Sequence, residues 1–339
     1  MKIKRISTTF DAIKRRHESK RGYLSASSIG SFQTCPRMYE YDKLRCIRPA
    51  EKSDALSFGS VVHKGLELIF DSLNDELLSK EQIRQFAKES ALEKAAECSL
   101  SQEDLCKVNV LLDSYIDLYF DEDRTLFDVV EVESRFANYA INPRTNREDG
   151  AVAVQGFCDA VIRNRMTGEY WVVEHKTASQ VTDGYLQRVN IDLQCAIYID
   201  AIRRKYGNCA GVIYDVLKKP KHVMSIGETD EEFEARKSAS KTGRIKRKMP
   251  ESLTDFYNRM RADVEDGFLV RQMVTLSDDM FADYRRDLWT IGRQINNTRH
   301  FCKSTCNCLK YGTCPYMDLC CANGNLHGLE DKYTVEAPF

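Results

Sequence analysis

Two neighbouring segments constrain the fold of this chain more than any other feature of its sequence. Residues 152–163 and 170–176 are rich in β-branched and aromatic side chains, and Met166-Thr167-Gly168 between them suits a tight turn. The pattern therefore predicts a β-hairpin. Asp159 stands in the first strand, and the triplet Glu174-His175-Lys176 ends the second. Because side chains alternate between the two faces of a strand, Glu174 and Lys176 share a face, and we expect Asp159 to project from the same face.

Two carboxylates and one ammonium group that meet on one face suit a particular chemistry. Hydrolysis of a phosphodiester needs a hard divalent cation on oxygen ligands, an activated water molecule and stabilisation of the developing charge. Asp159 and Glu174 can supply carboxylate ligands for Mg²⁺ or Mn²⁺, and the carbonyl of His175 is a further candidate ligand. Lys176 can hold the attacking water and stabilise the developing charge. The alternative is an E-x-K triplet on a solvated strand edge.

These residues resemble the motif of the PD-(D/E)XK nuclease superfamily, specifically its RecB-like branch, which includes CRISPR-associated and bacteriophage exonucleases. Asp159 matches the aspartate of the motif, and Glu174-His175-Lys176 matches its E-x-K element, while Cys158 stands where proline is common. The resemblance covers most of the chain. It implies an α/β fold, with a restriction-endonuclease-like core in which helices flank a mixed central sheet, and cleavage of DNA with Mg²⁺ or Mn²⁺.

Four further residues match positions of this family outside the central motif. Residues 58–63 resemble its upstream helix, which makes the imidazole of His63 a metal ligand; a structural histidine is the alternative. Gln194 and Tyr198 are four residues apart on a predicted helix, so they share one face, and the resemblance gives them a substrate-positioning role. Glu133 resembles an acidic residue that binds a second metal ion or orients water; an exposed strand glutamate is the alternative.

Cysteine is abundant, and six of the thirteen lie between positions 302 and 321. Thiolates from two distant segments suit either a [4Fe-4S] cluster or an all-thiolate zinc site. RecB-like nucleases with one early and three late cysteines carry iron and sulfur, so the resemblance favours the cluster, and zinc is the alternative. The ligands that it implies are Cys35, Cys308, Cys314 and Cys320.

Other cysteines compete for these positions, because the spacing departs from the C-x2-C-x5-C pattern that is common in related nucleases. The competitors are Cys302, Cys306 and Cys321, with Cys306 the strongest. We expect the cluster to be structural, since ligand bonds at both ends of a long loop constrain the unfolded chain.

Sequence patterns also predict how the chain is organised. Residues 1–21 form a basic leader, and residues 22–339 form one RecB-like nuclease domain. The domain divides into an arm with the first cluster ligand (22–60), a helical layer (61–128), the catalytic α/β core (129–300) and a cysteine-bound cap (301–339). Within the core, periodicity and turn signals predict strands at 129–137, 211–217 and 268–274, and helices at 185–206, 252–266 and 277–297.

Charge is almost balanced, with 50 lysines and arginines against 51 acidic residues, so DNA binding must come from local patches. The basic loop at 241–248 is one candidate, and a solvated loop is the alternative. Its candidate contacts are Lys241, Arg244, Lys246, Arg247 and Lys248. Lys218, Lys219 and Lys221 could grip phosphates at the catalytic edge.

The longest apolar runs are far shorter than the roughly 20 residues that span a bilayer, and the first twenty residues lack a secretory apolar stretch. We therefore expect no membrane partner and a cytoplasmic protein, in the host cytoplasm if the source is a phage. The expected function is a metal-dependent exonuclease on single-stranded DNA or DNA ends, in recombination, repair or phage DNA processing, alongside recombination or replication proteins. Two alternatives are a non-catalytic DNA-binding recombination partner and a zinc-stabilised or redox-sensing protein.

Overall fold

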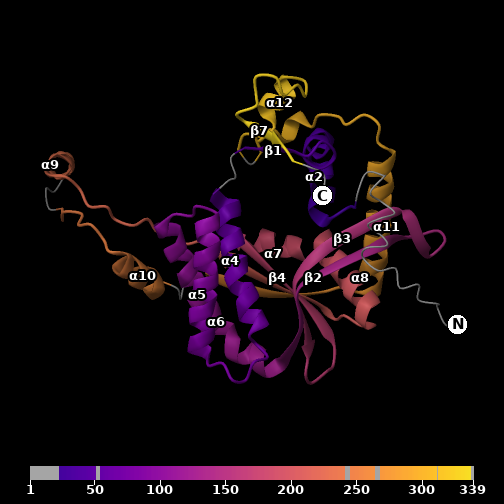
Figure 1. Ribbon diagram of the computed structural model, residues 1–339, viewed down its shortest axis with the longest axis horizontal. Coiled ribbons are helices and arrows are strands. Elements are labelled where there is room, and N and C mark those ends of the chain that lie inside the picture. The colour runs from indigo at the N-terminus through magenta and orange to yellow at the C-terminus, as the bar shows by residue number, and fades with distance from the viewer. Residues whose placement is uncertain (1–22, 51–53, 241–244, 264–267, 311, 337–339) are drawn as a thin grey trace.

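A mixed five-stranded sheet forms the centre of the computed structural model, which describes residues 23–50, 54–240, 245–263, 268–310 and 312–336 (Figure 1). The strands, in spatial order, are β2 (Phe127–Asn142), β3 (Arg147–Asn164), β4 (Tyr170–Ala178), β5 (Gly211–Lys218) and β6 (Leu269–Thr275). β4 and β5 run parallel, and the other neighbouring pairs are antiparallel. The predicted α/β fold with a mixed sheet is confirmed. The basic leader predicted at 1–21 lies outside the described residues.

β3 and β4 form the predicted hairpin, and Gly168 in its turn has a φ of 72°, which glycine adopts without strain. Their register runs from Arg163 opposite Tyr170 to Ala160 opposite Val173. The pairing ends there, one residue before Asp159 and Glu174. Beyond that point β3 stays paired with β2, and β4 stays paired with β5. The two acids therefore lie opposite one another where the sheet divides.

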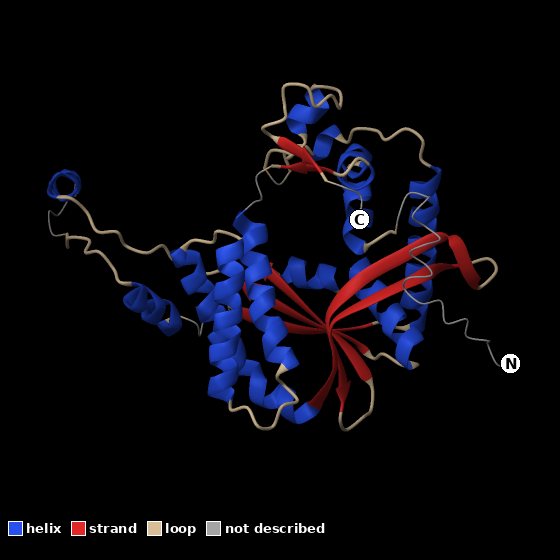
Figure 2. Cartoon of the chain, in the orientation of Figure 1, coloured by secondary structure: helices blue, strands red, loops and turns tan. Residues whose placement is uncertain are grey.

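Three helices cover one face of the sheet (Figure 2). They are α4 (Asp54–Asp71), α5 (Lys80–Glu97) and α6 (Gln102–Leu126). The side chains of Ser79 and Ser101 accept hydrogen bonds from the first turns of α5 and α6, which fixes where these helices begin. Apolar side chains of α4 and α6 form one buried cluster with Val173 and Ile213 of the sheet, and α5 packs on α4 and α6. The helical pattern of this stretch in the sequence is confirmed.

The opposite face of the sheet packs on helices from distant parts of the chain. They are α2 (Ala26–Thr34), α7 (Asp183–Val189), α8 (Leu193–Tyr206) and α11 (Asp278–Asn297). The single helix predicted at 185–206 is wrong, because Asp192 accepts a hydrogen bond from the N–H of Gln194 and starts a second helix there. The predicted end of that helix is confirmed, since Gly207 follows it with a φ of 93°.

The early and late parts of the described chain meet in a small core of their own. The three-residue strands β1 (Ile47–Pro49) and β7 (Tyr333–Val335) pair antiparallel there, and they are too short to show a sequence period. The other elements of this unit are α3 (Pro36–Tyr39), π-helix η1 (Glu40–Leu44), 3₁₀ helix η3 (Thr305–Asn307) and α12 (Met317–Cys321). Its core side chains are Tyr41, Ile47, Tyr316, Leu319 and Tyr333.

Between β5 and β6 the chain leaves the body as an arm, which Figure 1 shows reaching far to one side. The arm carries α9 (Asp230–Ala239) and α10 (Leu253–Ala262). α10 and α11 correspond to the two helices predicted after position 250. α9 was not predicted, because none of its residues is buried and it has no apolar stripe. Phe256 and Met260 tie α10 to α6.

Gly211, at the start of β5, provides a test of the sheet packing. A Cβ atom at this position would lie 2.2 Å from the backbone oxygen of Val274 on β6. Because that neighbour is backbone, we expect Gly211→Ala to lower the free energy of unfolding by roughly 1–3 kcal/mol in urea denaturation, as overpacking does. Gly150→Ala is the control, since no atom lies within 4 Å of its Cβ position. Equal stability of the two variants would contradict the prediction.

Candidate active site

Asp159 is held by two histidines. Its Oδ2 accepts a hydrogen bond from the backbone N–H of His175 at 2.7 Å and lies 3.1 Å from Nδ1 of the same residue. Its Oδ1 lies 3.4 Å from Nδ1 of His63 on α4. Burial opposes ionisation of this carboxyl group, but the hydrogen bonds and charges of the two histidines outweigh it and lower the pKa of Asp159. Asp159 is therefore a charged carboxylate at neutral pH.

Glu174 is a buried carboxylate with one occupied and one free oxygen. Oε1 accepts hydrogen bonds from Nζ of Lys176 and, at 2.8 Å, from Nε2 of Gln194. Oε2 is buried and has no hydrogen-bond partner among the described residues. Burial and the charge of Asp159 raise the pKa of Glu174. A buried carboxylate oxygen without a partner is costly, and a cation at this position would relieve that cost.

The structure brings Glu174 and Lys176 of the predicted motif into contact on the α8 side of the sheet. Asp159, on the neighbouring strand, turns its carboxylate toward His63 of α4 and the ring of His175. The expectation that Asp159 and Glu174 project from one face is therefore wrong for these side chains.

Lys176 binds Glu174 directly, and although burial lowers the pKa of Lys176, the charges of Glu174 and Asp159 raise it overall. As the side chains lie, no three histidine, cysteine, aspartate or glutamate residues in the described part of the chain converge closely enough to ligate one ion. Glu174 in particular turns Oε1 toward Lys176 and Gln194.

His63 and Glu133 complete the surroundings of Asp159. Both line one small hollow together with Asp159 and His175. Glu133 lies on β2 with a φ of 49°, between residues that pair with Ala160 and Cys158, and so stands beside Asp159. Partial burial and the charge of Asp159 raise the pKa of Glu133, which is the repulsion that a bound cation would offset. The ligand roles of His63, Glu133 and the His175 carbonyl stay predictions.

Gln194 and Tyr198 share one face of α8, as predicted. Nε2 of Gln194 donates to the Tyr198 hydroxyl at 2.5 Å, as well as to Glu174. Gly156 allows this arrangement, because a Cβ there would lie 2.5 Å from the Phe136 ring and 3.3 Å from the Tyr198 ring. The amide and the hydroxyl therefore lie next to the carboxylate, while their role toward a substrate stays a prediction.

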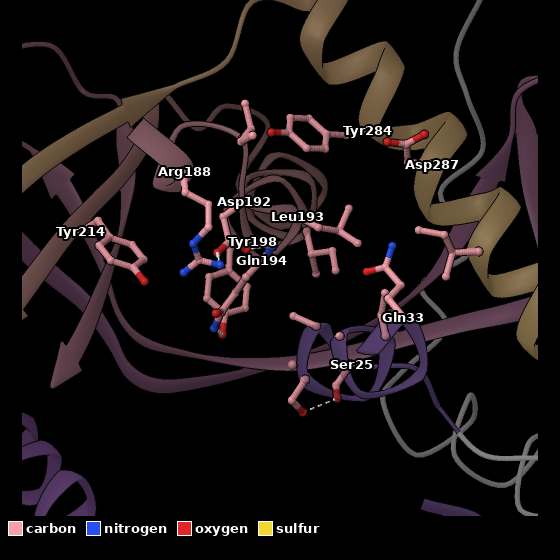
Figure 3. Close-up of a pocket in the computed structure, with 18 of the residues that line it drawn as sticks. Ser25, Gln33, Arg188, Asp192, Leu193, Gln194, Tyr198, Tyr214, Tyr284 and Asp287 are labelled. Carbon is pink, nitrogen blue, oxygen red and sulfur yellow. Dashed lines mark hydrogen bonds and ion pairs between the residues drawn. The ribbon is translucent and has the colours of Figure 1, made fainter. Parts of the chain in front are cut away.

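A cavity of about 850 Å³ opens beside this cluster, and Lys176, Gln194 and Tyr198 line it. Figure 3 shows α8 residues facing Tyr214 and Arg188 on one side and Tyr284 of α11 on another, with Ser25 and Gln33 of α2 nearby. Sequence reasoning identified Tyr198 but missed the other tyrosines of this lining, which are Tyr185, Tyr214 and Tyr284. They carry no signal of their own, because aromatic residues on helices and strands usually belong to a core.

The four predicted cluster cysteines line a second cavity, of about 280 Å³. Burial, and then the charges of Cys308 and Cys35, raise the pKa of Cys314, which reflects how close these thiols lie. The N–H of Ser304 donates to Sγ of Cys35 at 3.4 Å. Among the competing cysteines, Cys321 lines this cavity, whereas the exposed Cys302 and Cys306 do not. Cys306 is therefore not the strongest competitor in this geometry.

The predicted DNA-contacting residues fall into two places. Lys241 and Arg244 lie outside the described residues, and Lys246, Arg247 and Lys248 lie on the arm. Figure 1 shows α9, which precedes them, far from β4, so this segment does not flank the catalytic edge. Arg247 already pairs with Asp230 at 2.6 Å.

Lys218, Lys219 and Lys221 lie closer, in a hollow of about 370 Å³ that His222 and Phe268 also line. Lys218 stands in parallel register with Ala178, two residues after Lys176. The hollow therefore lies at the end of the sheet that carries the acids. The expected contacts of these lysines with DNA phosphates stay a prediction.

A comparison with known families decides the identity of this fold. The model described as the PD-(D/E)XK nuclease superfamily matches residues 23–321. The chain belongs to the PD-(D/E)XK nuclease superfamily. Membership of a nuclease family implies a nucleic acid substrate. The matched range of this PD-(D/E)XK nuclease includes Asp159 and the Glu174-His175-Lys176 triplet, whose assignment to the family motif stays a prediction.

Solved structures add two similar chains. A protein from Eubacterium rectale described as a "Putative exonuclease" aligns over 100% of this PD-(D/E)XK chain and 97% of its own, with 12% identity and a TM-score of 0.45. The structure of SSO0001 covers 82% of each chain, with 13% identity and a TM-score of 0.29. No curated protein matches in sequence. No helix within the described ranges is long and apolar enough to cross a membrane.

Proposed function

We propose that this PD-(D/E)XK nuclease is a metal-dependent DNA exonuclease of the RecB-like branch, which hydrolyses phosphodiester bonds of single-stranded DNA or DNA ends. The observation that carries the proposal is the buried Glu174–Lys176 pair, which lies within the electrostatic influence of the Asp159 carboxylate where β3 and β4 separate. Recombination, repair and phage DNA processing are the processes that such an activity would serve. Recombination or replication proteins would be its partners.

The residues present fit a hard divalent cation. Asp159 and Glu174 would hold Mg²⁺ or Mn²⁺, because Oε2 of Glu174 is a buried carboxyl oxygen without a partner among the described residues and a cation would favour its ionised form next to the charge of Asp159. His63, Glu133 and the carbonyl of His175 would complete the ligand set from the other side of Asp159. When bound, the ion supplies Lewis-acid activation of water and phosphate oxygens at neutral pH.

The remaining polar groups of the site are arranged to bind and orient a phosphodiester. Lys176 is held by Glu174 and also lines the cavity, so its ammonium group can stabilise negative charge on a phosphate and hold the attacking water. The Gln194 amide donates its two hydrogens to Glu174 and to the Tyr198 hydroxyl, and this leaves the Tyr198 O–H, which faces the cavity, to donate to phosphate or sugar oxygens. The protein thus contributes position and charge.

The size of the cavity favours an unpaired strand. Its volume of about 850 Å³ suits a few unpaired nucleotides rather than a duplex, which supports single-stranded DNA or frayed ends as the substrate. Phe157, Tyr185 and Tyr284 of the lining offer rings on which bases can stack, a sequence-tolerant interaction of roughly 1–3 kcal/mol per base.

Lys176→Ala tests the catalytic assignment. Because this ammonium group is aimed at the developing charge, we expect its loss to lower kcat on end-labelled single-stranded DNA with Mn²⁺ by at least about 10²-fold, in the range of lost charge-stabilising groups. Binding of the same DNA in EDTA should change little. Lys94→Ala on the exposed face of α5 is the control. Full cleavage by Lys176→Ala would refute the assignment.

The cysteine cavity tests the [4Fe-4S] part of the proposal against structural zinc. The four thiols surround a cavity of about 280 Å³ without converging on one point, which suits a bulky cluster better than a single tetrahedral ion. We expect protein purified without oxygen to be brown and to contain iron, and Cys314→Ser to lose both the colour and the iron. Cys302→Ser should retain them, since Cys302 is exposed and outside the cavity. Stoichiometric zinc without iron would establish the alternative.

The lysine hollow and the arm offer competing places for phosphate contacts. We expect the double variant Lys218→Ala/Lys221→Ala to weaken single-stranded DNA binding and to reduce the slope of log K against log salt by roughly 1.4, at about 0.7 per lost contact. Lys246→Ala/Lys248→Ala on the arm should change the slope less, since the arm lies away from β4. Fluorescence anisotropy at several salt concentrations in EDTA measures both. A larger effect of the arm variant would move the DNA path onto the arm.

A further inference from the structure

A chain of buried polar groups leads from Asp159 away from the cavity. His175 stands between Glu174 and Lys176, so strand alternation turns its ring to the opposite face of β4. Nδ1 of this ring lies 3.1 Å from Oδ2 of Asp159, and Nε2 lies 3.3 Å from the hydroxyl of Tyr115 on α6. The ring therefore connects Asp159 to the helical layer.

Tyr115 is in turn fixed by two neighbouring strands. Its hydroxyl donates to Oδ2 of Asp215 at 2.7 Å and accepts from Nη2 of Arg271 at 3.0 Å. The strand register aligns His175 with Asp215, and Asp215 with Arg271. These three side chains therefore stand side by side on β4, β5 and β6, and the Tyr115 hydroxyl contacts all three of them.

Arg271 anchors the far end of this row. Nε and Nη2 each bind Asp215 at 2.8 Å, and Nη1 and Nη2 bind Asp123 of α6 at 2.6 and 2.9 Å. The guanidinium carbon lies 3.9 Å from the ring centre of Tyr119. His175, Asp215 and Asp123 are all at most 3% exposed. The geometry of the row is thus fixed by short, buried contacts.

Stability alone does not account for such a row. Burial of two carboxylates and a guanidinium group costs desolvation, and apolar side chains of similar size often stabilise a core as well or better. What this row does provide is a fixed orientation, since each group is held by two or more directed hydrogen bonds. Its contact with the acid cluster is the ring of His175, which binds the oxygen of Asp159 that His63 leaves free.

We propose that Tyr115, backed by Asp215 and Arg271, is a positioning residue that sets the orientation of the Asp159 carboxylate through the ring of His175. With Oδ2 of Asp159 held by the His175 ring and backbone N–H, rotation of the carboxylate is restricted, and its remaining lone pairs keep a fixed direction. The inference rests on the proposed function, in which Asp159 is a metal ligand. Groups that orient metal ligands in this way typically contribute 10–100-fold to metal affinity or activity, roughly independent of substrate binding.

Tyr115→Phe tests the proposal, because it removes the hydroxyl and keeps the ring. We expect the Mn²⁺ dissociation constant to rise, or kcat to fall, by roughly 10–100-fold, while KM for single-stranded DNA changes little. Tyr119→Phe is the matched control: it lies one turn later on α6, its ring packs on Arg271, and no described residue hydrogen-bonds its hydroxyl. Wild-type Mn²⁺ affinity and kcat are expected for the control.

Mn²⁺ affinity, measured by calorimetry without DNA, separates this proposal from the proposed function. A wild-type protein that binds Mn²⁺ but cuts no DNA would end the exonuclease proposal, and the Tyr115→Phe affinity would still decide the positioning role. A Tyr115→Phe protein that melts earlier but keeps wild-type Mn²⁺ affinity and kcat would overturn that role, as would a wild-type protein without Mn²⁺ affinity. If Tyr115→Phe does not fold, Asp215→Asn carries the same expectation, because it keeps the shape and weakens the hold on Tyr115.

Discussion

The division of the sheet beyond Ala160 and Val173 is the constraint on which the rest of the site depends. A hairpin that stayed paired would bury the region between Asp159 and Glu174 under ladder hydrogen bonds. Instead, Oδ2 of Asp159 accepts a hydrogen bond from the backbone N–H of His175. Without strand pairing at this point, that N–H would otherwise lack a partner. The carboxylate thus takes the place of a strand carbonyl as the acceptor, and the two acids lie on neighbouring strands at the point where the sheet divides.

Much of this arrangement could be predicted from the sequence, because it follows from local periodicity. The alternating strands, the turn at Gly168 and the four-residue spacing of Gln194 and Tyr198 all depend on near neighbours in the chain. The break at Asp192 could not be predicted in this way, because a capping side chain interrupts a helix whose apolar pattern runs on. The apolar pattern predicted one continuous helix, whereas the hydrogen bond of Asp192 begins a new one.

Polar groups buried by distant contacts were the other part that the sequence concealed. Asp215 lies between apolar residues of its strand, Arg271 lies next to Gln272 on β6, and only the register of three strands brings both beside His175. Tyr115 and Asp123 lie on α6. From sequence alone, a helical tyrosine is usually read as a core residue and a helical aspartate as a surface residue. The Asp159 end of this row could be anticipated from a sequence motif. Its other end, Arg271, is held by tertiary contacts with Asp215 and Asp123 that no local pattern predicts.

Helix α2 connects the large cavity to the cysteine cavity. Its N-cap Ser25 and the helix residues Ala26, Ile29 and Gly30 line the large cavity, and its C-cap Cys35 lines the cysteine cavity. A movement of Cys35 would therefore shift the whole of this nine-residue helix. Oxidation of those thiols is therefore expected to displace α2 and, with it, one wall of the large cavity.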